Sequence, residues 1–300
     1  MSADDLDSRP SLLTPDDLPA VFRAADLVAV RERGRFDRAS RARLVLLVLA
    51  AAAALIESEP AQVPLGPVLS GAALLAVLGL ELFVLRTRAD EESHRARVRA
   101  ESARALAWRY AAGGRPFEVD QPPEAVDRAV LRALLADPTV VSPTGEMSGG
   151  QITPAMRALR ARPAGERLSA YLRGRVIDQR DWYARAARDH DRRAARWATV
   201  LLALESLAVV VALIMAAGLI DVDVLSVVAA VVAAALAWSE AGQHRKLAVS
   251  YATAGHGLAG VAALAEHIRT GSDDDRVRDL VDEAEAVIAA EHSLWRARHG

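Results

Sequence analysis

Apolar residues are concentrated in two pairs of segments, and the second pair is the clearer one. Between residues 197 and 239 there is no Lys or Arg, and the only charged residues are Glu205, Asp221 and Asp223. The run 197–220 is long enough for a helix that crosses the roughly 30 Å hydrocarbon layer, which takes about 20 residues. The run 224–239 is shorter and can span if its flanks snorkel. We therefore predict a transmembrane hairpin with its turn at the two aspartates.

The first pair of segments follows the same order. Residues 44–56 are apolar but few for a spanning helix, although the arginines before them can snorkel and extend it. Residues 61–85 are uncharged apart from Glu81, and the connection 57–60 contains two glutamates. The pattern predicts a second hairpin, and therefore four spans in total.

Basic residues flank both hairpins, whereas both turns are acidic. Five arginines precede the second hairpin, at 185, 188, 192, 193 and 196, and Arg86 and Arg88 follow the first. Short loops rich in Lys and Arg remain on the cytoplasmic side. We expect a multi-pass protein of the cell (inner) membrane with both termini in the cytoplasm. Trp197 and Trp238 then lie at headgroup depth as interfacial anchors.

Long amphipathic stretches follow each hairpin, and we expect them to form cytoplasmic helices. Apolar residues between 247 and 268 recur at three- and four-residue steps, which is typical of a coiled-coil-like seam. The order of elements occurs twice, and a Gly- and Pro-rich region separates the copies. We predict an all-α membrane protein with a first two-transmembrane domain at 1–115, a linker with a short helix at 116–162, and a second domain at 163–300.

Composition adds three points to this pattern. The chain is 52% apolar but only 4% aromatic, and all but one of its 37 basic residues are Arg. We interpret the excess of Arg as a sign of a GC-rich coding sequence more than of a binding site. The absence of Cys excludes disulfides, thiolate metal sites and cysteine nucleophiles.

Short segments next to each hairpin resemble those of one family. Residues 99–110, RAESARALAWRY, with Pro116 and Phe117 after them, are similar to the helix that follows the hairpin in one subtype of the SLATT family (SMODS and SLOG-associating two-transmembrane effector domains). Residues 175–183, RVIDQRDWY, resemble the Gln-x-x-Trp-Tyr helix that opens another subtype. Residues 285–298 resemble the end of that subtype, where the family more often has Glu-Asn in place of Glu-His. Two copies in tandem would cover about residues 20–300.

The resemblance implies a membrane effector of a prokaryotic conflict or antiphage system. Such a protein would form a homo-oligomer and perforate or depolarise the lipid bilayer after a cytosolic, nucleotide-linked signal from a partner protein. The alternative is a non-conducting membrane scaffold or sensor whose cytoplasmic helices recruit a partner. We expect no enzymatic activity and no cofactor, because no acid–base or metal constellation is evident.

Polar residues inside the spans are the candidates for an ion pathway. Glu205 lies roughly 12 Å into the third span at the helical rise, and a carboxylate there usually faces protein or water. With Ser206 it could line a pore, or it could be protonated or paired and simply hold the bundle together. Glu81 is a weaker candidate, because it lies close enough to the end of its span to reach the interface.

Other motifs favour structural roles. The string Gly255-His256-Gly257-Leu258-Ala259-Gly260 matches a dinucleotide fingerprint, but no strand precedes it. The histidines are too scattered for a metal site, and the arginine runs flank spans, so nucleic acid is not expected as a partner. The aromatic residues of the family-like segments are predicted to pack between cytoplasmic helices; they are Trp108, Tyr110, Trp182, Tyr183 and Trp295.

Overall fold

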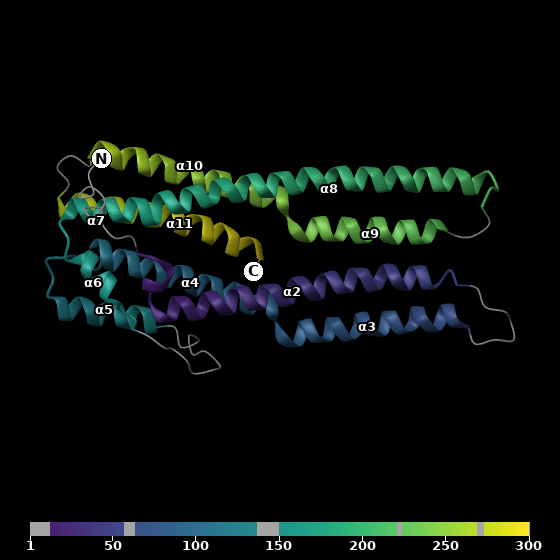
Figure 1. Cartoon of the computed structure of the whole chain (residues 1–300), viewed down its shortest axis with the longest axis horizontal. Coiled ribbons are helices and arrows are strands. Elements are labelled where there is room, and N and C mark those ends of the chain that lie inside the picture. Colours follow the sequence, from purple (N-terminus) through teal and green to yellow (C-terminus); the bar gives the residue numbers. More distant parts are fainter. Residues whose placement is uncertain (1–12, 57–63, 137–149, 221–223, 269–272, 300) are drawn as a thin grey trace, which may run out of the picture. The chain divides into compact units, whose positions relative to one another are not determined.

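The computed structural model describes residues 13–56, 64–136, 150–220, 224–268 and 273–299, and within these ranges it contains helices and no strand (Figure 1). The all-helical class is therefore confirmed for the described residues. The α-helices are α2 (Ala20–Ala53), α3 (Leu65–Thr87), α4 (Ala89–Ala112), α5 (Pro123–Leu135), α6 (Pro154–Arg160), α7 (Ala164–Tyr171), α8 (Asp178–Ala216), α9 (Val224–Gly242), α10 (His244–Ile268) and α11 (Asp274–His299). A short 3-10 helix, η1 (Pro15–Asp17), precedes α2, and a π-helical segment, η3 (Leu172–Ile177), joins α7 to α8.

The chain divides into two compact units, and both are built from non-contiguous segments. We call residues 1–30, 93–187 and 249–300 the packed unit, and residues 31–92 and 188–248 the hairpin unit. Helices α2 and α8 each contribute residues to both units. The division therefore separates the predicted hairpins from the amphipathic helices. It does not separate the first repeated copy from the second.

The packed unit has a continuous apolar core. Helix α4 contributes a stripe of alanines at three- and four-residue spacing, namely Ala100, Ala103, Ala107 and Ala111, all nearly inaccessible to solvent. The small side chains on this face let neighbouring helices approach closely. The larger side chains of Trp108 and Tyr171 fill the space between the helices elsewhere in the core. Helix α10 adds the face that periodicity predicts, including Leu258 and Val261, and α11 adds Leu280 and Val281.

Two arginines hold the chain where α4 ends. Gly113 follows the helix with a φ of 80°, a conformation that suits glycine. The buried Arg167 donates from Nη1 to the Ala112 carbonyl at 2.8 Å. Arg160 donates to the carbonyls of Tyr110 and Phe117, at 2.8 and 2.7 Å. The bond from Arg167 gives a donor to a carbonyl in the last turn of α4, and the bonds from Arg160 tie the end of the helix to the loop that follows it.

The segment predicted as a linker supplies part of this core. Its described portion contains α5 and α6, and Val126, Val130 and Met156 are completely buried. The short helix expected there corresponds to α5. Residues 137–149 lie outside the described ranges.

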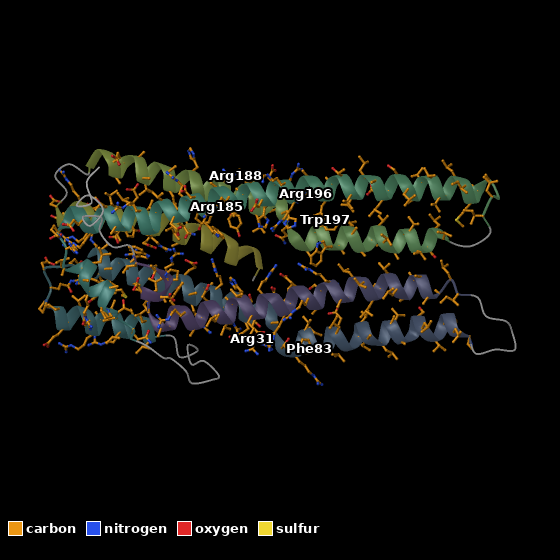
Figure 2. All side chains as sticks on the ribbon, in the orientation of Figure 1. Arg31, Phe83, Arg185, Arg188, Arg196 and Trp197 are labelled. Carbon is orange, nitrogen blue, oxygen red and sulfur yellow. The ribbon has the colours of Figure 1, made fainter. Side chains whose placement is uncertain are left out.

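The hairpin unit is organised in the opposite way, with apolar side chains on its surface. Figure 1 shows α2 beside α3 and α8 beside α9. Leu75 of α3 is 70% exposed, and Leu202 and Leu213 of α8 are each 66% exposed. Side chains project along the full lengths of these helices in Figure 2, where Arg188 and Arg196 precede Trp197 on α8. Such a surface is unfavourable in water and suits a hydrocarbon solvent.

Three described stretches are long and apolar enough to cross a membrane: Leu65–Ala112, Ala164–Ala216 and Val224–Glu266. Helix α2 is not among them, because its apolar end, residues 44–53, is only about 15 Å long at the helical rise. The fourth span therefore stays a prediction. Both acidic turns, at 57–60 and 221–223, lie outside the described residues.

The two copies share a backbone feature where each hairpin ends. Arg88, between α3 and α4, has a φ of 45°, and Gln243, between α9 and α10, has a φ of 43°. These are the non-glycine residues with positive φ within the described ranges. Left-handed backbone is unfavourable for such residues, so its presence at corresponding joints supports the predicted duplication.

Candidate functional site

The predicted pathway residues are not brought together by the fold. Glu205 and Ser206 are exposed on α8, and the Ser206 hydroxyl donates to the carbonyl of Leu202 at 2.7 Å. Within the described ranges Glu205 has no ion-pair partner, whereas Glu81 of α3 pairs with Arg43 of α2. Glu81 therefore belongs to a different environment from Glu205, near the base of the first hairpin.

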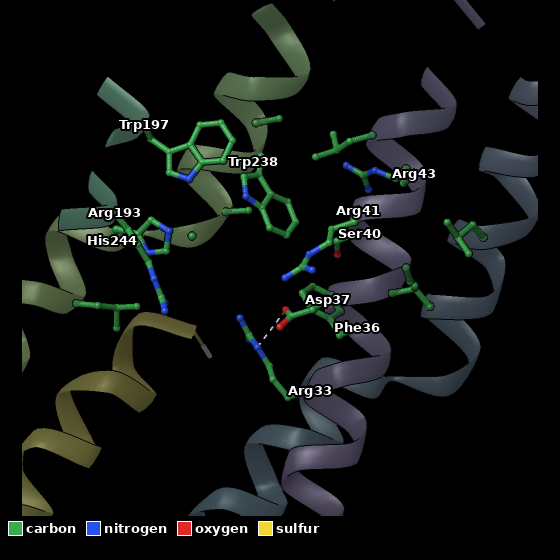
Figure 3. Close-up of a pocket in the computed structure, with 18 of the residues that line it drawn as sticks. Arg33, Phe36, Asp37, Ser40, Arg41, Arg43, Arg193, Trp197, Trp238 and His244 are labelled. Atoms are coloured by element: carbon green, nitrogen blue, oxygen red, sulfur yellow. Dashed lines mark ion pairs between the residues drawn. The ribbon is translucent and has the colours of Figure 1, made fainter. Parts of the chain in front are cut away.

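That environment is a cleft of about 660 Å³ within the hairpin unit, which we call the basal cleft (Figure 3). Residues of α2 and α3 form one wall, and residues of α8, α9 and the start of α10 form the other. Both predicted interfacial anchors, Trp197 and Trp238, line it, and so does Glu81. The cleft therefore joins the two hairpins at the ends that the sequence places in the headgroup region.

The basal cleft carries excess positive charge. Four arginines line it, with two carboxylates, Asp37 and Glu81. Arg33 pairs with Asp37 at 3.2 Å, and Arg43 pairs with Glu81. The remaining two, Arg41 and Arg193, have no carboxylate partner in the part of the chain that is described. The Arg41 guanidinium lies 5.3 Å from the centre of the Trp238 ring, a cation–π contact between α2 and α9.

Two histidines lie at the other wall of the cleft. The Nδ1 atoms of His190 on α8 and His244 on α10 are 3.0 Å apart. When both rings are neutral, one Nδ1–H donates to the other ring's nitrogen. No group of three His, Cys, Asp or Glu side chains that could hold a metal ion occurs among the described residues.

The aromatic residues of the family-like segments lie in the packed unit. Trp108 and Tyr171 meet edge to face at 5.9 Å between ring centres. Trp182, Tyr183 and Tyr251 form a cluster with ring centres 5.2–5.8 Å apart, in which Tyr183 is buried and Trp182 is 38% exposed. The Trp295 side chain lies outside the described set.

Tyr110 has a polar as well as an apolar role. Its ring is buried, its hydroxyl donates to Asp127 Oδ1 at 2.7 Å, and Arg160 covers the ring at 4.9 Å from its centre. The residue thus joins α4, α5 and α6. A buried tyrosine hydroxyl must keep a hydrogen bond, and Asp127 supplies the acceptor here.

The packed unit also contains a buried ion pair that periodicity does not reveal. Arg175, within the π-helical segment η3, is completely buried and forms two bonds with Glu285 of α11, Nε to Oε1 at 2.9 Å and Nη2 to Oε2 at 3.0 Å. The Tyr171 hydroxyl donates to the same carboxylate at 3.1 Å. Glu101 of α4 lies 3.6 Å from Arg175 Nη1. This cluster links α4 of the first copy to α7, η3 and α11 of the second.

Electrostatics keep Glu285 ionised. Burial alone would raise the pKa of its carboxyl group, but the charge and hydrogen bonds of Arg175, together with the Tyr171 hydroxyl, hold the pKa below its ordinary value. A small cavity of about 170 Å³ adjoins the cluster. Its lining mixes charges of both signs, so it does not select an anion or a cation.

The glycine-rich string at 255–260 lies within α10 and has a packing role. A β-carbon at Gly255 would lie 3.4 Å from Cβ of Tyr183, and one at Gly257 would lie 2.9 Å from a methyl group of Val287. The missing side chains allow α10 to approach α8 and α11. A nucleotide site is not needed to explain these glycines.

Comparison with protein families gives two matches in tandem. The model of SMODS and SLOG-associating 2TM effector domain 3 matches residues 19–168. The model of SMODS and SLOG-associating 2TM effector domain 1 matches residues 171–295. The chain belongs to the SLATT family. Neither the curated proteins nor the solved structures give a match.

The SLATT assignment confirms the resemblance and its tandem arrangement. The two matched regions meet between residues 168 and 171, directly before the buried Tyr171 and Arg175. The Arg175 cluster therefore connects SLATT domains of two types, with Glu101 in the first match and Glu285 in the second. Membership of the family points to a membrane effector associated with SMODS and SLOG systems.

Proposed function

We propose that this SLATT protein is a membrane effector that oligomerises and perforates or depolarises the cell membrane after a cytosolic, nucleotide-linked signal. The observation that carries the proposal is the surface of the hairpin unit, where apolar side chains are exposed along α3, α8 and α9. A chain with this surface gains stability when hydrocarbon replaces water around it.

Both hairpins cross the membrane in this proposal, which makes four spans with both termini in the cytoplasm. Three described stretches satisfy the length requirement, and α2 completes the fourth span with help from the arginines at its base. The orientation follows from those arginines, since Lys and Arg near the ends of spans remain on the cytoplasmic side. The packed unit then lies in the cytoplasm, where it can receive the signal from a partner protein.

Glu205 supports oligomerisation. Its side chain is exposed on the surface of its own hairpin and has no ion-pair partner among the described residues. A carboxylate is costly in lipid, so such residues face other protein chains or water. A second copy of the chain can cover Glu205, and a ring of copies would place several carboxylates around a common path.

The test is the membrane potential of a bacterial host that expresses the full chain, followed with a voltage-sensitive dye. We expect depolarisation by the wild type and a clear reduction by Glu205→Gln. The control is Glu240→Gln, which makes the same change at an exposed carboxylate after the apolar part of α9. It should depolarise as the wild type does.

Equal depolarisation by Glu205→Gln and the wild type would remove Glu205 from the conduction mechanism. The alternative function, a non-conducting scaffold that recruits a partner, is favoured by the scarcity of polar side chains along α9 between its ends. It predicts that liposomes containing the purified protein retain a trapped dye with and without the activating partner.

A further inference from the structure

We propose that the basal cleft binds the phosphate headgroup of an anionic phospholipid. The inference depends on the membrane placement proposed above, but it does not depend on whether the protein conducts ions. It assigns a ligand class to a site that the pathway residues Glu205 and Ser206 do not share, because neither of them lines the cleft.

The charge of the cleft calls for an anion. Arg33 and Arg43 are largely neutralised by Asp37 and Glu81, whereas Arg41 and Arg193 have no carboxylate partner in the described chain. These two arginines come from opposite walls, α2 and α8, and both line the same cavity. A phosphate group between them would satisfy two guanidinium groups, which bind phosphate oxygens in a fork geometry.

The Arg41 side chain is already held for this role. Its guanidinium stacks against Trp238 at 5.3 Å from the ring centre, which limits the rotamer freedom that a bound ligand would otherwise remove. In Figure 3, Arg33, Arg41 and Arg43 extend from α2 toward the wall that carries Arg193 and Trp238. The donors are therefore positioned on a folded scaffold of helices.

The surroundings favour a lipid over a soluble phosphate compound. Leu44, Leu80 and Val84 line the cleft together with Trp197 and Trp238. Beyond this apolar part of the lining, α3 and α8 expose leucines along their lengths. A phospholipid can place its phosphate against the arginines and its acyl chains along these helices, whereas a free nucleotide would leave this apolar surface uncovered.

The experiment measures lipid binding to the full chain purified in detergent, by native mass spectrometry with added phosphatidylglycerol or phosphatidylcholine. The test variant is Arg41→Gln/Arg193→Gln. The control is Arg38→Gln/Arg192→Gln, which removes the same charge from the same helices at residues outside the cleft lining. We expect the test variant to bind phosphatidylglycerol about thirty-fold more weakly, from the usual contribution of two arginines at an anionic surface.

The control variant should bind phosphatidylglycerol as the wild type does, and phosphatidylcholine binding should be weak and equal in all three proteins. An equal loss in both double variants would overturn the proposal, because it would indicate general surface charge. Displacement of phosphatidylglycerol by inorganic phosphate or a nucleoside monophosphate at equal concentration would also overturn it, in favour of a soluble ligand. The circular dichroism of each variant checks that its helices are intact.

Discussion

The packed unit and the hairpin unit share helices α2 and α8 but place their apolar side chains in opposite ways. In the packed unit, leucines such as Leu168 and Leu258 are completely buried, and charged groups are paired across helices. In the hairpin unit, leucines cover the outside and the arginines gather at one end. Since α2 and α8 contribute to both units, a single helix changes its preferred surroundings along its length. The hydrophobic pattern of a long helix therefore has to be interpreted separately for each part of its length.

Arginine shows the difference most clearly. In the packed unit, Arg160 and Arg167 each bond several oxygen atoms in a fixed arrangement, and Arg175 is buried with a carboxylate. In the basal cleft, Arg41 and Arg193 have no carboxylate partner among the described residues. Arginine thus stabilises the core of the packed unit, whereas in the hairpin unit it leaves guanidinium groups that can bind an anion.

The largest expected effect is on the packed unit, from Arg175→Met. The substitution leaves the buried Glu285 carboxylate without its cation, and breaking a buried pair in this way costs about 3–5 kcal/mol. Chemical unfolding in a detergent micelle, followed by circular dichroism, measures the free energy. The double variant Arg175→Met/Glu285→Leu should recover part of the loss, and a single-variant effect below about 1 kcal/mol would contradict a buried pair.

A matched pair of leucines tests the contrast between the units directly. Leu258→Ala removes a completely buried side chain of the packed unit and should cost about 2–5 kcal/mol. Leu213→Ala removes a side chain that is 66% exposed in the hairpin unit, so it should change stability by less than about 0.5 kcal/mol in a micelle. The same unfolding measurement serves both. Similar losses at the two positions would mean that other protein covers Leu213.

A smaller effect than those of Arg175→Met and Leu258→Ala is expected within the first hairpin, at Gly66. A β-carbon there would lie 2.9 Å from the Ala53 carbonyl oxygen and closer still to that of Ile56. We expect Gly66→Ala to loosen the hairpin by about 1–3 kcal/mol, seen as faster hydrogen exchange of α3 amides by mass spectrometry. Gly71→Ala on the same helix is the control, since none of the described residues lies within 4 Å of its added carbon. Equal exchange in both variants would argue against the close approach.

Periodicity and charge predicted much of this architecture. Long uncharged runs indicated α3, α8 and α9, because few other structures accommodate so many consecutive apolar residues. The three- and four-residue spacing of Leu258, Val261 and Ala265 indicated the buried face of α10. Trp197 and Trp238 were placed at the base of the hairpins by their position alone, and the structure brings them into one cleft.

The polar interior could not be predicted in the same way. Arg175 and Glu285 are far apart in sequence, and an arginine in an amphipathic helix normally faces water. The excess of Arg was interpreted as a property of the coding sequence, but the forked contacts of Arg160 and Arg175 depend on the guanidinium group. The pairing in space decides the role of each arginine, and spacing along the chain does not contain that information.

The shared core has a consequence for the two SLATT copies as separate molecules. Trp108 of the first copy packs on Tyr171 of the second, and Glu101 lies beside Arg175. A chain cut near residue 170 would expose aromatic rings and a buried charge on the severed faces, and could cover them only by recruiting the missing half in trans. Because the two SLATT copies are covalently joined, their association does not depend on protein concentration. The tandem chain therefore behaves as a pre-assembled heterodimer of the two copies.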